Sequence, residues 1–138
     1  MNMRIAFGTD DGENLAKKHF GESRYFKIYE LIDSEKIVFL ETRENISGKE
    51  KGHGDPEKAK KISNILKDID ILVGYTFGPN LKRIKKKFLP IVSRYERIDE
   101  NIELIKQYLK TFIEELKRKD KRIFLINPGP ELRIIGAK

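Results

Sequence analysis

Two histidines are the residues of this chain best suited to bind a metal. His19 precedes Phe20-Gly21, and His53 stands between Gly52 and Gly54. Glycine on both sides of an imidazole lets the backbone approach a ligand closely and adopt positive φ. The histidines are 34 residues apart, which matches neither a His-Glu-x-x-His motif nor a zinc-finger spacing. Neither histidine therefore belongs to a local zinc motif.

A helix is expected to begin directly after the Gly52-His53-Gly54 segment. Asp55 is a good N-cap, and Pro56 suits the first helical turn. A helix start carries unpaired N–H groups and the positive end of the helix dipole, and both attract anions. The sequence therefore predicts an imidazole beside an anion-binding position. The alternative is a flexible turn that contains a histidine.

Apolar periodicity predicts the elements that position these residues. Strands are expected at residues 3–8, 24–32 and 36–42, of which the last two form a hairpin. A helix over about 56–67, a buried strand at 70–74 and a second helix after Gly78-Pro79 follow. A strand at 89–92 precedes a third helix, capped by Asp99, whose apolar stripe runs to Leu116.

The order βββαβαβα predicts an α/β domain with a mixed five-stranded sheet of the ribonuclease H-like type. It covers residues 1–116, and residues 117–138 are a basic linker with a short β-like extension. Two apolar pieces within 123–135 either add edge strands or form a homodimer. Ligands bind beyond the carboxyl ends of parallel strands. Three segments are expected to meet there: Thr9-Asp10-Asp11, Thr76-Phe77-Gly78 and the His53 loop.

Composition excludes several kinds of site. The chain has no cysteine, which rules out disulfides, thiolate zinc sites and all-cysteine iron–sulfur sites. The N-terminal apolar run is too short for a signal peptide or a membrane span, so a cytoplasmic protein is expected. Charged residues make up 37% of the chain, a composition that resembles thermophile proteins.

The net charge of +7 comes entirely from the second half of the chain. Residues 1–81 hold 13 basic and 14 acidic side chains, and residues 82–138 hold 16 and 8. One alternative function is therefore nucleic-acid binding through Lys82, Arg83, Lys85, Lys86, Lys87 and residues 117–122. A weaker alternative is a metal-dependent nuclease that uses Asp10 and Asp11. Asp70 begins its strand and is expected at the opposite end of the sheet from Asp10.

Several segments occur in an order that resembles a known family. They are Met3-Arg4-Ile5-Ala6, His19 to Phe26, Glu44-Asn45, Gly52-His53-Gly54 and Gly78-Pro79. Over about residues 3–113 the chain resembles the dinitrogenase iron–molybdenum cofactor-binding family of the NifX, NafY and NifB C-terminal type. The resemblance implies a ribonuclease H-like fold. It also implies a non-catalytic protein that carries an iron–sulfur or iron–molybdenum-type cofactor, or its precursor, among cofactor-assembly proteins.

Carried over by position, the resemblance implies a set of site residues. His19 and His53 would be the metal ligands or contacts, and Gly52 and Gly54 would admit anionic groups. Arg24 and the helix start at Gly78 would contact the anion. One imidazole can cap an open metal position on a preformed anionic cluster, and a basic surface helps to hold such a cluster. Tyr75-Thr76 stand where the family usually carries a Gly-Gly pair.

Overall fold

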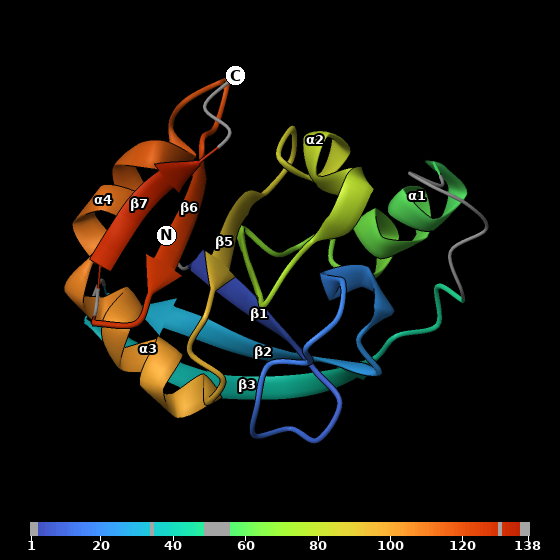
Figure 1. The fold of residues 1–138 in the computed structure, drawn as a ribbon, viewed down its shortest axis with the longest axis horizontal. Coiled ribbons are helices and arrows are strands. Elements are labelled where there is room, and N and C mark those ends of the chain that lie inside the picture. The colour runs from blue at the N-terminus through green and yellow to red at the C-terminus, as the bar shows by residue number, and fades with distance from the viewer. Residues whose placement is uncertain (1–2, 34, 49–55, 130, 136–138) are drawn as a thin grey trace.

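One mixed sheet runs through the molecule (Figure 1). The computed structural model describes residues 3–33, 35–48, 56–129 and 131–135. Within these ranges the sheet has seven strands in the order β3-β2-β1-β4-β5-β6-β7. The strands are β1 (Met3–Thr9), β2 (Tyr25–Ile32), β3 (Lys36–Glu44), β4 (Ile71–Gly74), β5 (Leu89–Ser93), β6 (Ile123–Asn127) and β7 (Glu131–Ile135). Strands β1, β4, β5 and β6 are parallel, while β2, β3 and β7 run antiparallel to their neighbours.

The predicted count of five strands is wrong, because the C-terminal apolar pieces join the sheet. Strand β6 pairs in parallel with β5, and β7 pairs with β6 as a hairpin. Both edges of β6 are thus paired within the chain, and the homodimer expected through residues 123–135 is not supported. The α/β class and the mixed sheet are confirmed. The ribonuclease H-like type and the division at residue 116 stay predictions.

The helices differ from the predicted ones mainly at their ends. They are α1 (Pro56–Ile65), α2 (Leu81–Ile84), α3 (Ile98–Gln107) and α4 (Leu109–Leu116), with short 3-10 turns η1 (Phe20–Glu22) and η2 (Gly78–Asn80). Asp99 is not the cap of α3. The helix begins at Ile98, one residue before Asp99, and Arg97 is its N-cap. The predicted third helix is two helices. At Tyr108 the backbone leaves helical geometry, with φ −105° and ψ 13°.

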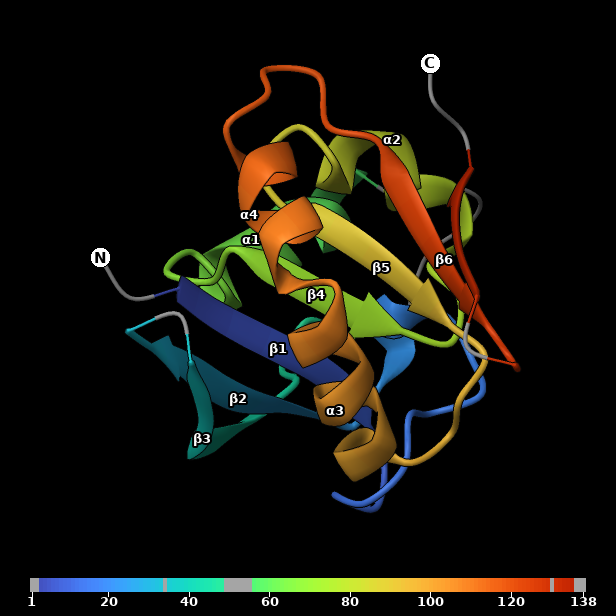
Figure 2. The same ribbon diagram turned by 90° about the vertical axis from the view of Figure 1, so that its left-hand side faces the viewer.

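Helices cover both faces of the sheet. In Figures 1 and 2, α3 and α4 lie on one face, and α1 and α2 lie on the other. Alternate residues of β1 face opposite sides, so Ile5 and Phe7 pack with α3 and α4 while Ala6 packs with α1. Burial on both sides explains the nearly continuous apolar runs of β1, β4 and β5. None of the described helices is long and apolar enough to span a membrane.

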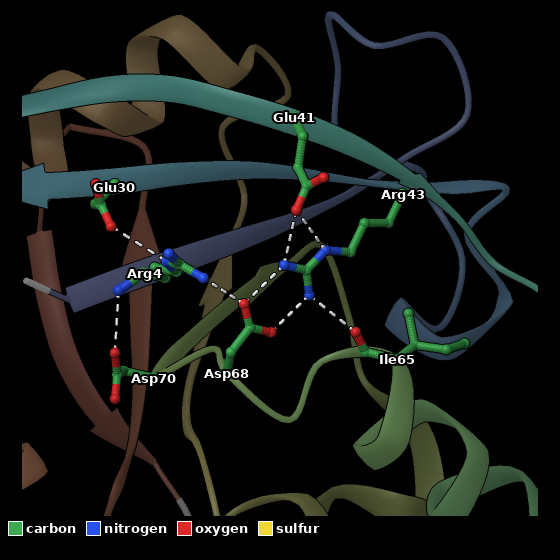
Figure 3. Close-up of polar contacts among 7 residues, drawn as sticks. All are labelled: Arg4, Glu30, Glu41, Arg43, Ile65, Asp68 and Asp70. Carbon is green, nitrogen blue, oxygen red and sulfur yellow. Dashed lines mark hydrogen bonds and ion pairs between the residues drawn. The ribbon is translucent and has the colours of Figure 1, made fainter.

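An ion-pair network closes the amino end of the central strands (Figure 3). Arg4 on β1 pairs with Glu30 on β2 at 3.2 Å and also with Asp68. Arg43 on β3 donates to both carboxylate oxygens of Asp68 at 2.7 Å, and to the carbonyl of Ile65 at 2.9 Å. The network therefore joins β1, β2 and β3 to the end of α1. Asp70 accepts from the Arg4 backbone N–H at this same end, away from Asp10 as expected.

Candidate functional site

The carboxyl ends of β1 and β4 are brought together by the segment that contains His19. The Phe20 N–H donates to the Thr76 carbonyl at 2.7 Å, and His19 and Thr76 form an isolated parallel bridge. Thr76 is the second residue after β4, so the His19 segment continues the strand pairing beyond the end of that strand. The Thr76–Gly78 loop thus meets the His19 segment, whereas its expected meeting with the His53 loop lies outside the described residues.

Phe20 anchors this segment in the core. Its ring stacks between Phe26 and Phe77, with centroid distances of 5.0 Å to each. A Cβ on Gly74 would lie 3.1 Å from the Phe20 side chain, so a side chain at the end of β4 would require Phe20 to shift by a few tenths of an ångström. With Phe20 held in this way, the preceding residue, His19, is placed at the rim of the sheet.

The His19 ring lies on the bare Cα of Gly78. A Cβ at Gly78 would be 2.4 Å from His19 Nδ1, and Gly78 has φ +75°, which favours glycine. The imidazole is half-buried and forms no hydrogen bond with any described residue. Gly78 was predicted as an anion-binding helix start. It opens η2, a turn of three residues, and the role that its geometry shows is to make room for His19.

A strongly basic pocket of about 810 Å³ opens beside His19. Four of the described side chains that line it are cationic and one is a carboxylate. The lining residues are Lys17, Lys18, His19, Glu22, Ser23, Arg24, Asn45, Gly48, Lys58 and Thr76. Of the predicted site residues, His19 and Arg24 are thus brought together, with Thr76 joining them from the β4 end. Clustered cations in a concave site attract an anionic ligand.

Lys58 in the first turn of α1 is a buried cation in this pocket. Only 3% of it is exposed, its ammonium donates to the Gly48 carbonyl, and it lies 3.3 Å from Glu22 Oε2. Gly48 and Lys58 stand on either side of residues 49–55, and both line the pocket. Gly52, His53 and Gly54 lie outside the described residues. The structure therefore leaves their assignment a prediction.

Asn45 at the end of β3 holds the pocket wall together. Its Nδ2 donates to the carbonyls of Gly21 and Ser23 at 2.8 and 2.7 Å, and its Oδ1 accepts from the N–H and the hydroxyl of Ser47. The side chain thereby fixes η1 and the start of β2 against the end of β3. In the sequence, Asn45 stands out only as part of the Glu44-Asn45 segment of the family resemblance.

The lysines of the pocket were missed by the sequence analysis. Lys17 and Lys18 belong to a polar stretch, and Lys58 belongs to a helix with many lysines, so no spacing distinguishes them. Ser23 was also missed. Its hydroxyl is buried, packs where a Gly8 side chain would be, and has no hydrogen-bond partner among the described residues.

Tyr75 adds one more cation, Arg94, beside the pocket and also contacts Lys17. The Arg94 guanidinium lies 4.7 Å from the centre of the Tyr75 ring, and Lys17 Nζ lies 5.9 Å from it. Arg94 also donates to the Tyr75 carbonyl at 2.8 Å. Such contacts between cations and an aromatic ring are favourable. Tyr75 therefore holds Arg94 and Lys17 beside the carboxyl end of β4.

The two aspartates after β1 serve the local fold. Asp11 accepts from Asn14 Nδ2 and from the N–H groups of Asn14 and Glu13, and these bonds lower the pKa of Asp11 to about 2. Asp10 accepts from the Arg24 N–H and pairs with Lys18 at 2.9 Å. Across the described ranges no three His, Asp or Glu side chains are grouped to hold a metal ion. This arrangement gives no support to the nuclease alternative.

Comparison with known protein families identifies the family of this chain. The model of the family described as "Dinitrogenase iron-molybdenum cofactor" matches residues 1–108. The chain belongs to this family. The resemblance found in the sequence is thereby confirmed. The family points to binding of a cluster related to the iron–molybdenum cofactor, or of its precursor.

A solved structure shows a similar fold. It is an NMR structure of a proposed dinitrogenase from Methanococcus jannaschii, with 19% sequence identity and a TM-score of 0.53. The similarity covers 78% of this chain and 89% of that one. At this identity the comparison concerns the fold alone. No curated protein matches the chain.

Proposed function

We propose that the chain is a non-catalytic carrier for an anionic iron–sulfur or iron–molybdenum-type cluster, or its precursor. The observation that carries this proposal is the His19 imidazole. It has no hydrogen-bond partner among the described residues, and it lies over Gly78 at the rim of a pocket lined by four cations. Family membership supports the same ligand class.

The pocket supplies two kinds of interaction that such a ligand needs. A neutral imidazole is a good ligand for iron, and one nitrogen suffices to cap an open metal position. The cations around it offset the negative charge of a sulfide-rich cluster. Because the chain has no cysteine, it cannot provide the thiolates on which clusters are held. The cluster would therefore arrive already assembled.

The lysines of the pocket are able to change partners. Lys17 pairs with Glu96 at 3.0 Å and Lys18 pairs with Asp10 at 2.9 Å, and both pairs are solvent-exposed. Exposed ion pairs contribute little stability, roughly 0–1 kcal/mol each. A bound anion would compete for these ammonium groups at small cost. Arg24, also exposed at the rim, would act in the same way.

His53 is proposed as a second ligand, with Gly52 and Gly54 admitting the anion. This assignment rests on the resemblance and on one structural fact. Gly48 and Lys58 both line the pocket, and they lie on the two sides of this segment in the sequence. It is tested separately from His19.

The first experiment supplies a synthetic thiolate-ligated [4Fe–4S] cluster, and separately tetrathiomolybdate, to anaerobic protein. Bound iron, molybdenum and visible absorption are measured for the wild type, His19→Ala and His53→Ala. We expect His19→Ala to weaken cluster binding about tenfold or more, since one metal–ligand bond is lost. Lys18→Ala should weaken binding of both anions.

The control is Lys36→Ala, which removes one exposed lysine from β3 outside the pocket. It should bind both probes like the wild type. Wild-type protein that takes up neither probe would contradict the proposed function. Equal binding by wild type and His19→Ala would show that His19 is no ligand.

A further inference from the structure

Two basic runs that are far apart in the sequence meet on one surface. Lys85 follows α2, and Asp120 lies in the segment between α4 and β6. Lys85 is only 9% exposed, and its ammonium lies 3.3 Å from Asp120 Oδ1. Figure 2 shows the segment after α4 passing beside α2. This ion pair therefore fixes the two runs next to each other.

The two runs carry far more positive than negative charge. Residues 81–88 contain no acid, and Asp120, the one acid of residues 117–122, faces Lys85. Arg118 and Arg122 both form ion pairs with the buried carboxylate of Glu115. Six lysines of this surface are in no ion pair with a described residue: Lys82, Lys86, Lys87, Lys117, Lys119 and Lys121. We call these six the α2 lysine surface.

This arrangement differs from the charge pattern that stabilises a protein. At the amino end of the sheet, Arg4 and Arg43 alternate with Glu30 and Asp68 in one network. Stabilising surface networks mix both signs in this way. Six lysines without carboxylates repel one another instead, which opposes folding. The α2 lysine surface is therefore better explained by a partner than by stability.

The chemistry of the surface favours an acidic protein segment. Single-stranded nucleic acids are bound with aromatic side chains on which bases stack. Residues 81–88 and 117–122 contain one aromatic side chain, Phe88, and it is buried. Helix α2 has four residues, too few to lie along a groove of duplex DNA. Flexible lysines suit scattered carboxylates, which need no fixed geometry.

We propose that the α2 lysine surface docks an acidic segment of a partner protein. The lysines would pair with successive Asp or Glu side chains, and the ion pair between the buried Lys85 and the exposed Asp120 would hold the two halves of the surface next to each other. None of the six lysines lines the His19 pocket, so the proposal does not depend on the proposed function. Attraction of this kind raises association rates and falls with salt.

The test measures binding of a 20-residue polyglutamate peptide by full-length protein, without any cluster, at low and physiological salt. Lys86→Glu/Lys119→Glu reverses two charges of the surface. Lys36→Glu/Arg97→Glu reverses two exposed cations elsewhere and changes the net charge equally. We expect the first variant to lose about tenfold in affinity and the second to lose less than about twofold.

Three results would overturn the proposal. Equal losses in both variants would mean that only net charge matters. Tighter binding of a 20-mer single-stranded RNA or duplex DNA, lost in the same surface variant, would make this a nucleic-acid surface. Absence of peptide binding at low salt would show that the lysines are merely solvated. Circular dichroism of both variants checks that each remains folded.

Discussion

At the scale of single residues, the pair of His19 and Gly78 decides the geometry of the site. The ring and the glycine are 59 positions apart in the numbering, yet the ring fills the space that a Gly78 side chain would take. Positive φ at Gly78 adds a second reason for glycine. Two independent constraints therefore fall on one residue, and they can be separated by experiment.

Gly78→Ala should cost more stability than Gly12→Ala. Both glycines have positive φ, +75° and +82°, but a Cβ at Gly12 meets nothing within 4 Å. Gly12→Ala should therefore cost only the backbone strain, about 1 kcal/mol. Gly78→Ala should cost roughly 2–4 kcal/mol, because it must also displace the imidazole.

Thermal unfolding and cluster uptake of the two variants provide the measurement. Gly78→Ala should also impair uptake, whereas Gly12→Ala should leave it unchanged. Equal destabilisation of both variants would mean that the His19 ring moves aside at no cost. In that case its position over Gly78 would not be fixed by the fold.

At the scale of elements, charged side chains join segments that the apolar pattern leaves unconnected. Glu115 at the end of α4 is 2% exposed and accepts from the Arg122 N–H at 2.7 Å and from its guanidinium at 2.8 Å. Burial raises the pKa of Glu115, but the Arg122 hydrogen bonds outweigh it and the net pKa lies below the usual range. Residues 117–122, expected as a linker, are thus anchored at both the Glu115 and the Lys85 contacts.

The Asp68 network should contribute stability that depends on pH. Hydrogen bonds from Arg43 hold the pKa of Asp68 well below its usual range, against the opposing effect of burial. A carboxyl whose folded-state pKa is lowered stabilises the protein above its unfolded-state pKa, near 4. That contribution is lost as pH falls through the lower, folded-state pKa. Asp68→Asn should cost about 1–2 kcal/mol at pH 7 and progressively less below about pH 4.

Denaturant unfolding at several pH values checks this, with Asp99→Asn as the control. Asp99 also pairs with an arginine, Arg97, and its pKa is also lowered, but the pair is exposed and lies within one helix start. Its substitution should cost much less stability than that of Asp68, because solvent screens the exposed pair. A cost for Asp68→Asn that is the same at pH 7 and pH 3 would contradict the role of its charge.

At the scale of the whole molecule, the C-terminal strands complete the sheet and the core. Phe124 and Ile126 on β6 are buried and pack with Phe112 of α4 and with Ile91 of β5. Each such side chain contributes roughly 1.5–3 kcal/mol by burial. Without β6, one edge of β5 would lose its partner. We therefore expect the fold of residues 1–116 to depend on residues beyond them.

A chain of residues 1–116 should not unfold cooperatively, because it loses contributions comparable to a typical total stability of about 5–15 kcal/mol. A chain of residues 1–129 keeps β6 and loses only the partly exposed β7. It should unfold cooperatively at a lower temperature than the full chain. Calorimetry distinguishes the two. Cooperative unfolding of residues 1–116 would support the domain boundary predicted at residue 116.

The sequence by itself determined the class of fold, the family, and those residues of the site that belong to a recognisable motif. Periods of two and of about 3.6 placed β1 to β5 and α1 within a few residues, since these patterns follow from local geometry. The His-Phe-Gly segment and Gly78-Pro79 marked two sides of the site, and family comparison confirmed the resemblance. The break at Tyr108 escaped prediction, because the apolar stripe continues through both helices.

Only the tertiary structure decided which charges meet and where the tail goes. An apolar run such as Ile123–Asn127 fits a central strand, an edge or a partner equally well, and its place beside β5 depends on the rest of the sheet. Lys58, Asn45 and the Lys85–Asp120 pair act through residues distant in sequence. Periodicity reports the burial of apolar faces, whereas the position of a polar side chain depends on partners that folding brings to it.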